Sequence, residues 1–451
     1  MIGRGSAAAR FRTSGVSMDS YMPRRRDGLR LASSLVLWLA LGAPPGFAQT
    51  SLSLELAVAD ATARSRLVSA AESQTQAARE TAAAAGQLPD PVLKLGLTNL
   101  PIDGPDRYSV TRDFMTMRSV GVMQELTRTD KRSARVRRAE REVDLAKVVR
   151  QATIADLQRD AATAWLERSY QESMRELLQA QIAQAEMQVQ AAETLYRSGK
   201  GSQAEVFAAR GSVEQLRDGL ALTERQVAVA TTQLGRWVGG NAQLPLGPRP
   251  ALTLPTWTAG ALAEHLTQHP QIAAAVQQEA IADSEAVVAR AARSSDWSVE
   301  LMYSQRGPAY SNMVSINLSV PLQWDQKNRQ DRDLAARLAG IDEARARREE
   351  VQRAHEAEVR AMLQEWRSHE DRLRRYDASL LPLAMQRSEA ALAAYRSGTG
   401  PLPAVLDARR GEVDVRMERL RIEMDRARLW AQLNYLLPSH DGAQAKPEAA
   451  R

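Results

Sequence analysis

The hexapeptide YRSGKG (Tyr196–Gly201) returns almost unchanged as YRSGTG (Tyr395–Gly400). Superimposing the two copies also pairs Val206 with Val405 and Leu234 with Leu433, and the similarity extends upstream with a drifting offset. A period of about 200 residues is too long for a solenoid. The sequence therefore predicts two similar halves, each organised around one copy of the hexapeptide.

The segments on either side of each hexapeptide have the pattern of long coiled-coil helices. Ser133 to Tyr196 contains neither proline nor glycine, and apolar residues step by alternating threes and fours on both sides of each hexapeptide. Each half is thus predicted to contain an antiparallel helical hairpin. The hexapeptide forms its tip, because glycine lets the chain reverse between two helices.

Four shorter segments alternate between apolar and polar residues and predict strands. They are Leu93–Leu97, about Arg118–Glu125, Trp297–Tyr303 and Val314–Val320. One apolar and one polar face suit either a soluble sheet or a membrane barrel with lipid outside and water inside. Transmembrane barrels need about eight strands or more, so a membrane barrel would require several chains.

The remaining elements are a helix before each strand pair, predicted at Leu54–Gly86 and Ala261–Arg293. Pro270 marks a helix start in the second of these, and Pro382 predicts a kink in the last long helix. The predicted division is a signal peptide (1–49), a first repeat (50–238), a linker or equatorial strap (239–260), a second repeat (261–437) and a disordered tail (438–451).

The first 49 residues resemble a secretory signal, with a basic stretch at Arg24–Arg30 before the apolar run Leu31–Gly42. An N-terminal membrane anchor is the alternative. Cleavage would remove +5 of the formal net charge of +6, so the charge gives no argument for nucleic-acid binding.

The order helix, strand, strand, long helix, glycine tip, helix, occurring twice, resembles the TolC family of outer-membrane efflux channels. The resemblance is carried by YRSGKGSQAEVFAAR (Tyr196–Arg210) and YRSGTGPLPAVLDAR (Tyr395–Arg409), and by the strand exits VGVMQEL (Val120–Leu126) and INLSVPL (Ile316–Leu322). It implies a mainly α fold in which a homotrimer forms a 12-stranded transmembrane β-barrel and a periplasmic α-helical barrel.

The same resemblance implies a function and partners. The protein would be a passive conduit in the outer membrane of a Gram-negative bacterium, surrounded by lipid, with no enzymatic activity and no cofactor. It would receive substrates from an inner-membrane RND-type pump through a periplasmic adaptor. A periplasmic adaptor itself, which has one hairpin and many more strands, and a structural coiled-coil protein, which has no use for strands, are the other classes considered.

The resemblance also implies site residues. The adaptor would dock on the tips, at Tyr196, Arg197, Ser198, Gly199, Tyr395, Arg396, Ser397 and Gly398. Asp407 falls on the second acidic position of the family's constriction, whereas Ala404 departs from the first. Glu205, the equivalent of Ala404 in the first half, is a candidate supplement to a carboxylate ring that favours cations.

The stretch LPDPVLKLGLTNLP (Leu88–Pro101), followed by GVMQEL and DKRSAR, resembles the heavy-metal cation branch. Multidrug efflux and type I secretion remain alternatives. Methionines lie in or near the predicted strands at Met115, Met117, Met123, Met302 and Met313. Their spacings define no ligand set, so they are predicted to fill irregular apolar surface rather than bind copper.

No other pattern in the sequence indicates chemistry. His265 and His269 are four residues apart, a spacing that can bind a metal, but no further ligand pattern accompanies them, so both are predicted to lie on a helix surface. The chain has no cysteine and no GxSxG motif. The sequence therefore predicts no metal site and no catalytic residues.

Overall fold

The computed structural model describes residues 51–254 and 269–436. The predicted signal peptide and the predicted tail lie outside these ranges, as do His265 and part of the predicted linker. No helix in the described ranges is long and apolar enough to cross a membrane.

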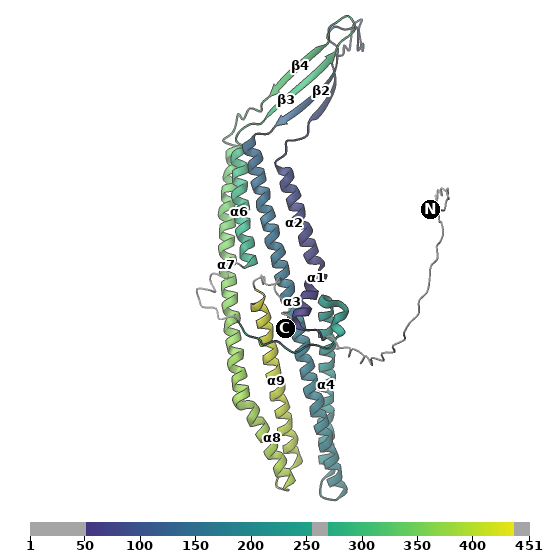
Figure 1. The fold of residues 1–451 in the computed structure, drawn as a ribbon, viewed down its shortest axis with the longest axis vertical. Coiled ribbons are helices and arrows are strands. Elements are labelled where there is room, and N and C mark those ends of the chain that lie inside the picture. The colour runs from purple at the N-terminus through teal and green to yellow at the C-terminus, as the bar shows by residue number, and fades with distance from the viewer. Residues whose placement is uncertain (1–50, 255–268, 437–451) are drawn as a thin grey trace, which may run out of the picture. The chain divides into compact units, whose positions relative to one another are not determined.

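The fold is dominated by two helical hairpins whose tips lie at the same end of the described chain, opposite the strands (Figure 1). The first hairpin pairs α3 (Thr129–Arg197) with α4 (Gln203–Val238). The second pairs α7 (Gln330–Arg375), a short π-helical segment (Tyr376–Leu380) and α8 (Leu381–Arg396) with α9 (Leu402–Asn434). Both hairpins predicted from the repeated hexapeptide are confirmed.

Shorter helices precede each strand pair, and here one prediction is wrong. The expected helix Leu54–Gly86 is two helices, α1 (Leu54–Arg64) and α2 (Arg66–Ala85), separated at Ser65. Ser65 has an extended backbone, and its hydroxyl accepts hydrogen bonds from the amides of Leu67 and Val68. A serine N-cap begins a new helix despite the alanine-rich composition around it.

In the second half, α6 (Pro270–Ala291) begins at the proline that predicted its start. The residue before it, His269, caps the helix by accepting the Gln271 amide at Nδ1. His269 is only 9% exposed, so its predicted position on a helix surface is wrong. A neutral imidazole serves as the cap there because it offers an acceptor nitrogen and can be buried.

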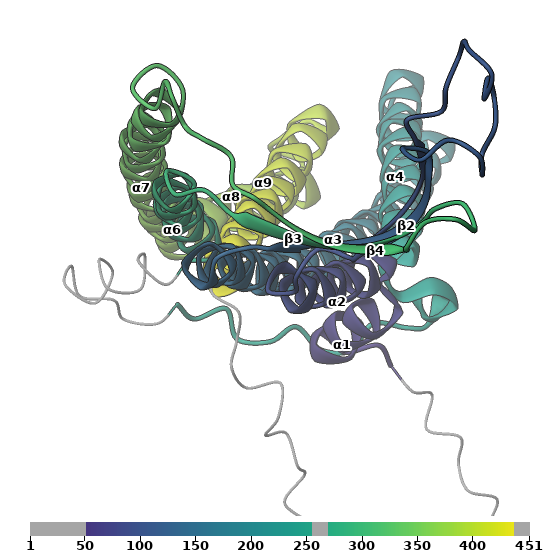
Figure 2. The same ribbon diagram turned by 90° about the horizontal axis from the view of Figure 1, so that it is seen from above.

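The strands form one antiparallel sheet in the order β1 (Val92–Thr98), β2 (Met117–Leu126), β3 (Trp297–Gln305) and β4 (Met313–Ser319). The sheet is curved when seen from above (Figure 2). One row of the register joins Lys94, Gly121, Met302 and Ser315. Because successive side chains alternate between faces, this row fixes which residues share a face.

The two faces of the sheet differ in chemistry. The apolar face carries exposed side chains: Leu93, Leu95, Leu97, Val120, Val122, Leu301, Tyr303, Val314, Ile316 and Leu318. The polar face carries Lys94, Ser119, Met123, Ser298, Glu300, Met302, Ser304, Met313, Ser315 and Asn317. The predicted alternation is confirmed.

A largely buried ion pair connects the sheet to the helices. Lys131, in the first turn of α3, donates to Asp296, immediately before β3, at 2.7 Å. The other oxygen of Asp296 accepts the amide of Arg128. The C-terminal end of β2 is therefore held beside the N-terminal end of β3. This contact joins the two halves of the duplication.

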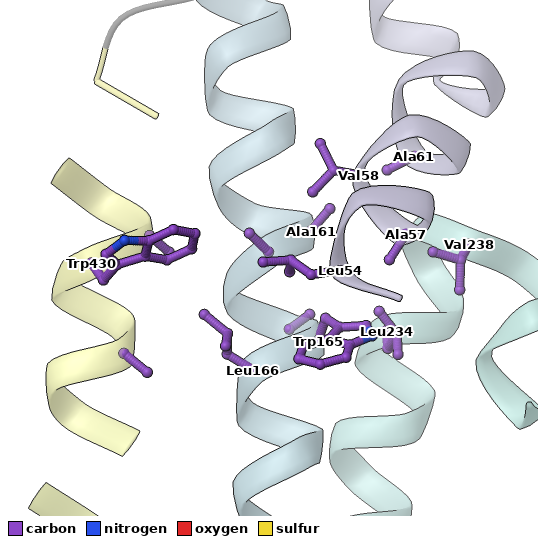
Figure 3. Packing of buried hydrophobic residues seen from close by; sticks show 14 of the residues in the cluster. Leu54, Ala57, Val58, Ala61, Ala161, Trp165, Leu166, Leu234, Val238 and Trp430 are labelled. Atoms are coloured by element: carbon purple, nitrogen blue, oxygen red, sulfur yellow. The ribbon is translucent and has the colours of Figure 1, made fainter. Parts of the chain in front are cut away.

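The largest core lies at the middle of the helices, around Trp165 of α3 (Figure 3). Trp165 is fully buried between α1 and α4, and its indole N–H donates to the carbonyl oxygen of Leu52. Leu52 in turn bonds to Pro245 and Gly247, and the indole of Trp430 in α9 donates to Thr253. Residues 244–254 thus cross the helices as a strap at this level.

Candidate functional site

The first tip reverses the chain through five residues after α3. Gly199 adopts a left-handed backbone with φ of 71°. The Lys200 amide donates to the carbonyl of Leu195 at 2.9 Å, and the Gly199 amide donates to Tyr196 at 3.0 Å. These two bonds form a Schellman motif, in which a left-handed glycine satisfies the last carbonyls of a helix. The Ser198 hydroxyl donates to Leu195 as well.

The second tip has the same geometry. Gly398 has φ of 75°, the Thr399 amide donates to Ala394 at 2.9 Å, and the Gly398 amide donates to Tyr395 at 3.1 Å. The Ser397 hydroxyl donates to Ala394, as Ser198 does to Leu195 in the first copy. The repeated hexapeptide therefore encodes the same backbone reversal twice.

The glycines of each tip are required for different reasons. A Cβ added at Gly199 or Gly398 would meet no atom within 4 Å, so only their positive φ favours glycine. A Cβ at Gly201 would lie 3.2 Å from Leu195, and one at Gly400 would lie 3.0 Å from Ala394. The first glycine of each tip thus faces open space, while the second allows two backbone segments to approach closely.

The helices that follow the two tips begin differently. At α4, Ser202 and Glu205 form a capping box: the Ser202 hydroxyl accepts the Glu205 amide, and the Glu205 carboxylate accepts the Ser202 amide at 2.9 Å. At α9, Pro401 is the N-cap and makes no side-chain bond, and Pro403 follows. The Glu205 carboxylate predicted to supplement the constriction is therefore already engaged in starting a helix.

The two tips share one apolar core. Ala192, Val206 and Ala209 of the first hairpin are buried together with Leu402 and Val405 of the second. The sequence showed two separate tips, and did not show that they pack on each other. The contact arises from residues that occupy equivalent places in the two halves, such as Val206 and Val405.

The two tyrosines of the tips are consequently not equivalent. Tyr395 packs against the shared core, and its pKa is raised by burial and then by the nearby negative charge of Glu205. Tyr196 is 47% exposed. Tyr395 therefore contacts the first hairpin of the same chain. Tyr196 leaves about half of its surface exposed and available to another molecule.

Charged side chains close to the tips form ion pairs on the surface of the first hairpin. Glu193 accepts hydrogen bonds from Arg210 at 2.6 Å and from Arg197 at 3.3 Å. The Arg210 bond is the main reason that the pKa of Glu193 lies below its usual value, against the opposing effect of burial. Arg396 and Asp407 are exposed, Asp407 in the second turn of α9.

A groove of about 1150 Å³ lies between α3, α4 and α9, above the shared core of the tips. Glutamines of α3 line one wall (Gln171, Gln181, Gln184 and Gln188), and alternating charges of α9 line another (Arg409, Arg410, Asp414, Glu418, Arg421 and Asp425). The sequence analysis missed this groove because its walls come from three helices. Their heptad patterns, taken one at a time, do not show it.

The described residues contain no group of three or more His, Asp or Glu side chains that could hold a metal ion. The site consists of two exposed tips at which the chain reverses, the apolar core that the tips share, and a charged groove. Such an arrangement can bind another protein or line a passage.

Comparison with known proteins agrees with this geometry. Residues 57–240 match the family model described as outer membrane efflux protein. No curated protein sequence matches the chain. The match covers α1 to α4 with both strands of the first half, and so includes the first tip.

Solved structures match over most of the chain. The outer-membrane channel OprN superposes with a TM-score of 0.73 at 18% identity, covering 85% of this chain and 89% of that chain. The chain has the fold of an outer-membrane channel. The outer membrane protein VceC from Vibrio cholerae gives 0.71 at 17% identity, covering 85% and 96%. CusC gives 0.70 at 17% identity, covering 85% and 91%.

Proposed function

We propose that the chain is one protomer of a trimeric outer-membrane efflux channel. The observation that carries the proposal is the sheet at one end of the helices, whose apolar face is exposed along all four strands. An exposed apolar face of this extent requires lipid or protein to cover it. The match to outer membrane efflux proteins supports lipid.

The need for several chains follows from the edges of the sheet. β1 and β4 are the outer strands in the described sheet, each paired on one side. Unpaired backbone groups are too costly in hydrocarbon to leave open, so strands in a membrane must close into a barrel. Three copies of a four-stranded sheet, joined edge to edge, provide that closure and match the trimer implied by the TolC resemblance.

The tips would then form a ring at the periplasmic end and dock the adaptor of an inner-membrane RND-type pump. Within the chain Tyr395 lies near Glu205. By the symmetry of the duplication, the open side of Tyr196 would face position 404 of the next protomer, where an alanine replaces the glutamate. The ring would therefore alternate between two kinds of groove, each presenting the same backbone reversal.

The proposal is tested by purifying the protein from outer membranes in detergent. We expect a heat-modifiable trimer that gives discrete single-channel conductance in planar bilayers. A water-soluble monomer recovered from the periplasm, folded without detergent, would contradict the proposal and favour a structural coiled-coil protein.

For the cargo, we propose heavy-metal cations, on the resemblance of Leu88–Pro101 and the strand exits to the heavy-metal branch. Multidrug efflux and type I secretion remain the alternatives. Deleting the gene should increase sensitivity to metal salts and leave drug sensitivity unchanged; the reverse result would assign drug efflux.

A further inference from the structure

The methionines of the strands do not lie where the sequence analysis predicted. Met123, Met302 and Met313 were expected to fill apolar surface, and the register places all three on the polar face. Met117, opposite Thr98, is on the same face. The apolar face of the described sheet contains no methionine, although a lipid-covered surface accommodates that side chain readily.

Three of these residues form a diagonal across the sheet, which we call the methionine diagonal (Met123, Met302 and Met313). Met302 is directly opposite Gly121, two residues from Met123 on β2. It is directly opposite Ser315, two residues from Met313 on β4. Each neighbouring pair is therefore a diagonal pair, with Cα atoms about 7–8 Å apart and within reach of long side chains.

The direction of the diagonal is also regular. The step from β2 to β3 and the step from β3 to β4 both move two residues away from the helices, toward the loops that end the sheet. The diagonal therefore runs along the polar face in the direction in which a cargo would leave. Met302 occupies its middle and belongs to both pairs.

The surroundings favour a soft monovalent cation over a hard divalent one. Glu300, directly opposite Met123, pairs with Lys94 at 2.7 Å. Lys94 reaches across β2 at Gly121, which has no side chain to block it. With this carboxylate neutralised, the groups between Met123 and Met302 are thioethers and hydroxyls, because Glu125, the other carboxylate on this face of the described sheet, lies on the far side of Met123, toward the helices. Thioether sulfur selects Cu(I) and related soft ions, whereas Mg²⁺ and Ca²⁺ require carboxylate and carbonyl oxygen.

We propose that the methionine diagonal is a pair of low-affinity sites for soft monovalent cations, Cu(I) or Ag(I), one between Met123 and Met302 and one between Met302 and Met313. Each site holds the ion between two thioether sulfurs, an arrangement that two-coordinate Ag(I) accepts. The inference rests on the proposed channel, in which the polar face lines the water-filled lumen. It narrows the proposed cargo from heavy-metal cations in general to cations that prefer sulfur ligands.

The sharing of Met302 gives a distinctive experimental signature. Ag(I), which needs no reductant, is titrated into the full-length protein purified in detergent, and the bound ions per chain are counted after equilibrium dialysis. Leucine keeps the size of methionine and removes only the sulfur. M302L should lose both ions, and M123L and M313L should lose one each. M117L, on the same face but off the diagonal, should bind as the parent does.

Single-channel conductance of the same preparations separates this inference from the proposed function. All four variants should conduct small monovalent ions as the parent does, since no charge and little volume changes. Equal Ag(I) binding by the parent and M302L, in protein that conducts normally, overturns the methionine diagonal and leaves the channel standing. Failure of the parent to conduct contradicts the channel itself. Loss of Ag(I) binding in M117L to the same extent as in M302L also overturns the proposal.

Discussion

At the scale of single residues, two stacked histidines from different helices are expected to make the folded chain less stable in acid. His269 at the start of α6 and His355 of α7 stack with ring centroids 3.8 Å apart. Burial, then the charge of His355, then that of Arg159 lower the pKa of His269 to about 4. Burial also lowers the pKa of His355, against the opposing effect of Glu358. Burial therefore favours the neutral form of both imidazoles in the folded chain.

This arrangement predicts a loss of stability in acid. An exposed histidine has a pKa of about 6.5, so between about pH 6.5 and 4 the unfolded chain binds a proton that folded His269 does not. Stability should be constant with respect to His269 above about pH 6.5. Below that pH, the proton taken up by His269 in the unfolded chain should lower the free energy of unfolding by at most about 1.4 kcal/mol per pH unit. The measurement is the thermal midpoint of the purified protein across this range.

His269→Asn is the matched variant for this prediction. Asparagine also caps helices but does not titrate. We expect the variant to lose less stability than the parent between about pH 6.5 and 4. An identical loss in the variant would show that the acid sensitivity comes from other groups.

The tip glycines allow folding and docking to be separated at a single position. Gly398 has φ of 75° and open space around it, so valine there introduces backbone strain of about 1–3 kcal/mol but no collision. We expect Gly398→Val and Gly199→Val to assemble as trimers and to fail in export, because a branched side chain would then project from the proposed docking surface.

Gly398→Asn is the control for the tip, since asparagine tolerates the left-handed conformation. It should assemble and retain more export activity than the valine variant. If Gly398→Val instead fails to form trimers, as judged by heat-modifiable migration, the glycine serves folding rather than docking.

At the scale of the secondary-structure elements, the second hairpin bends between α7 and α8 (Figure 1), and Pro382 lies in the first turn of α8. Proline has no N–H and its ring collides with the carbonyl four residues before it, here that of Ala378. The chain accommodates this by a π-helical segment, Tyr376–Leu380, in which the Leu381 amide donates to Tyr376. The predicted kink is thus a local widening of the helix.

Replacing this proline should tighten the bend region. Pro382→Ala supplies an amide and removes the collision, so residues 376–386 should exchange their amide hydrogens more slowly than in the parent. Pro403→Ala is the control, because a proline in the first turn of a helix displaces no helical hydrogen bond. Unchanged exchange in Pro382→Ala would show that the packing of the segment on α9, through Asp377 and Arg419, sets the bend instead.

Features that depend on local sequence patterns could be predicted, whereas features that depend on tertiary contacts could not. Period-two alternation and the repeated glycine tip located the strands and the hairpins, because both are local rules. The break at Ser65 was not predicted, because the alanine-rich composition on both sides of it favours one continuous helix. The face of Met302, between Leu301 and Tyr303, was also readable from the alternation. The shared core of the tips and the groove between three helices were not readable, because they depend on tertiary contacts.

At the scale of the whole molecule, the two candidate carboxylates of the constriction should behave differently. Asp407 is exposed on α9, whereas the Glu205 carboxylate caps α4. Asp407→Ala should raise leak conductance and weaken block by multivalent cations, because it removes a carboxylate ring from the proposed trimer. Block is measured as the change in single-channel current on addition of the cation.

Glu205→Gln is the comparison for Asp407. Glutamine can still cap a helix, so stability should change by less than about 1 kcal/mol. Cation block should stay close to that of the parent, because the Glu205 side chain is turned back onto its own backbone. Equal effects of the two substitutions on block would place both carboxylates in the passage, and no effect of Asp407→Ala would remove Asp407 from it.

The strap at the middle of the helices has a practical consequence for labelling the protein. Leu52 is held under the indole of Trp165, and the last described residues follow α9 at a similar level. A fluorophore at Ser51 or Leu436 would therefore be distant from both the strands and the tips. In the proposed trimer, such a probe could report on assembly through energy transfer between protomers while leaving the tips and the sheet of each chain unmodified.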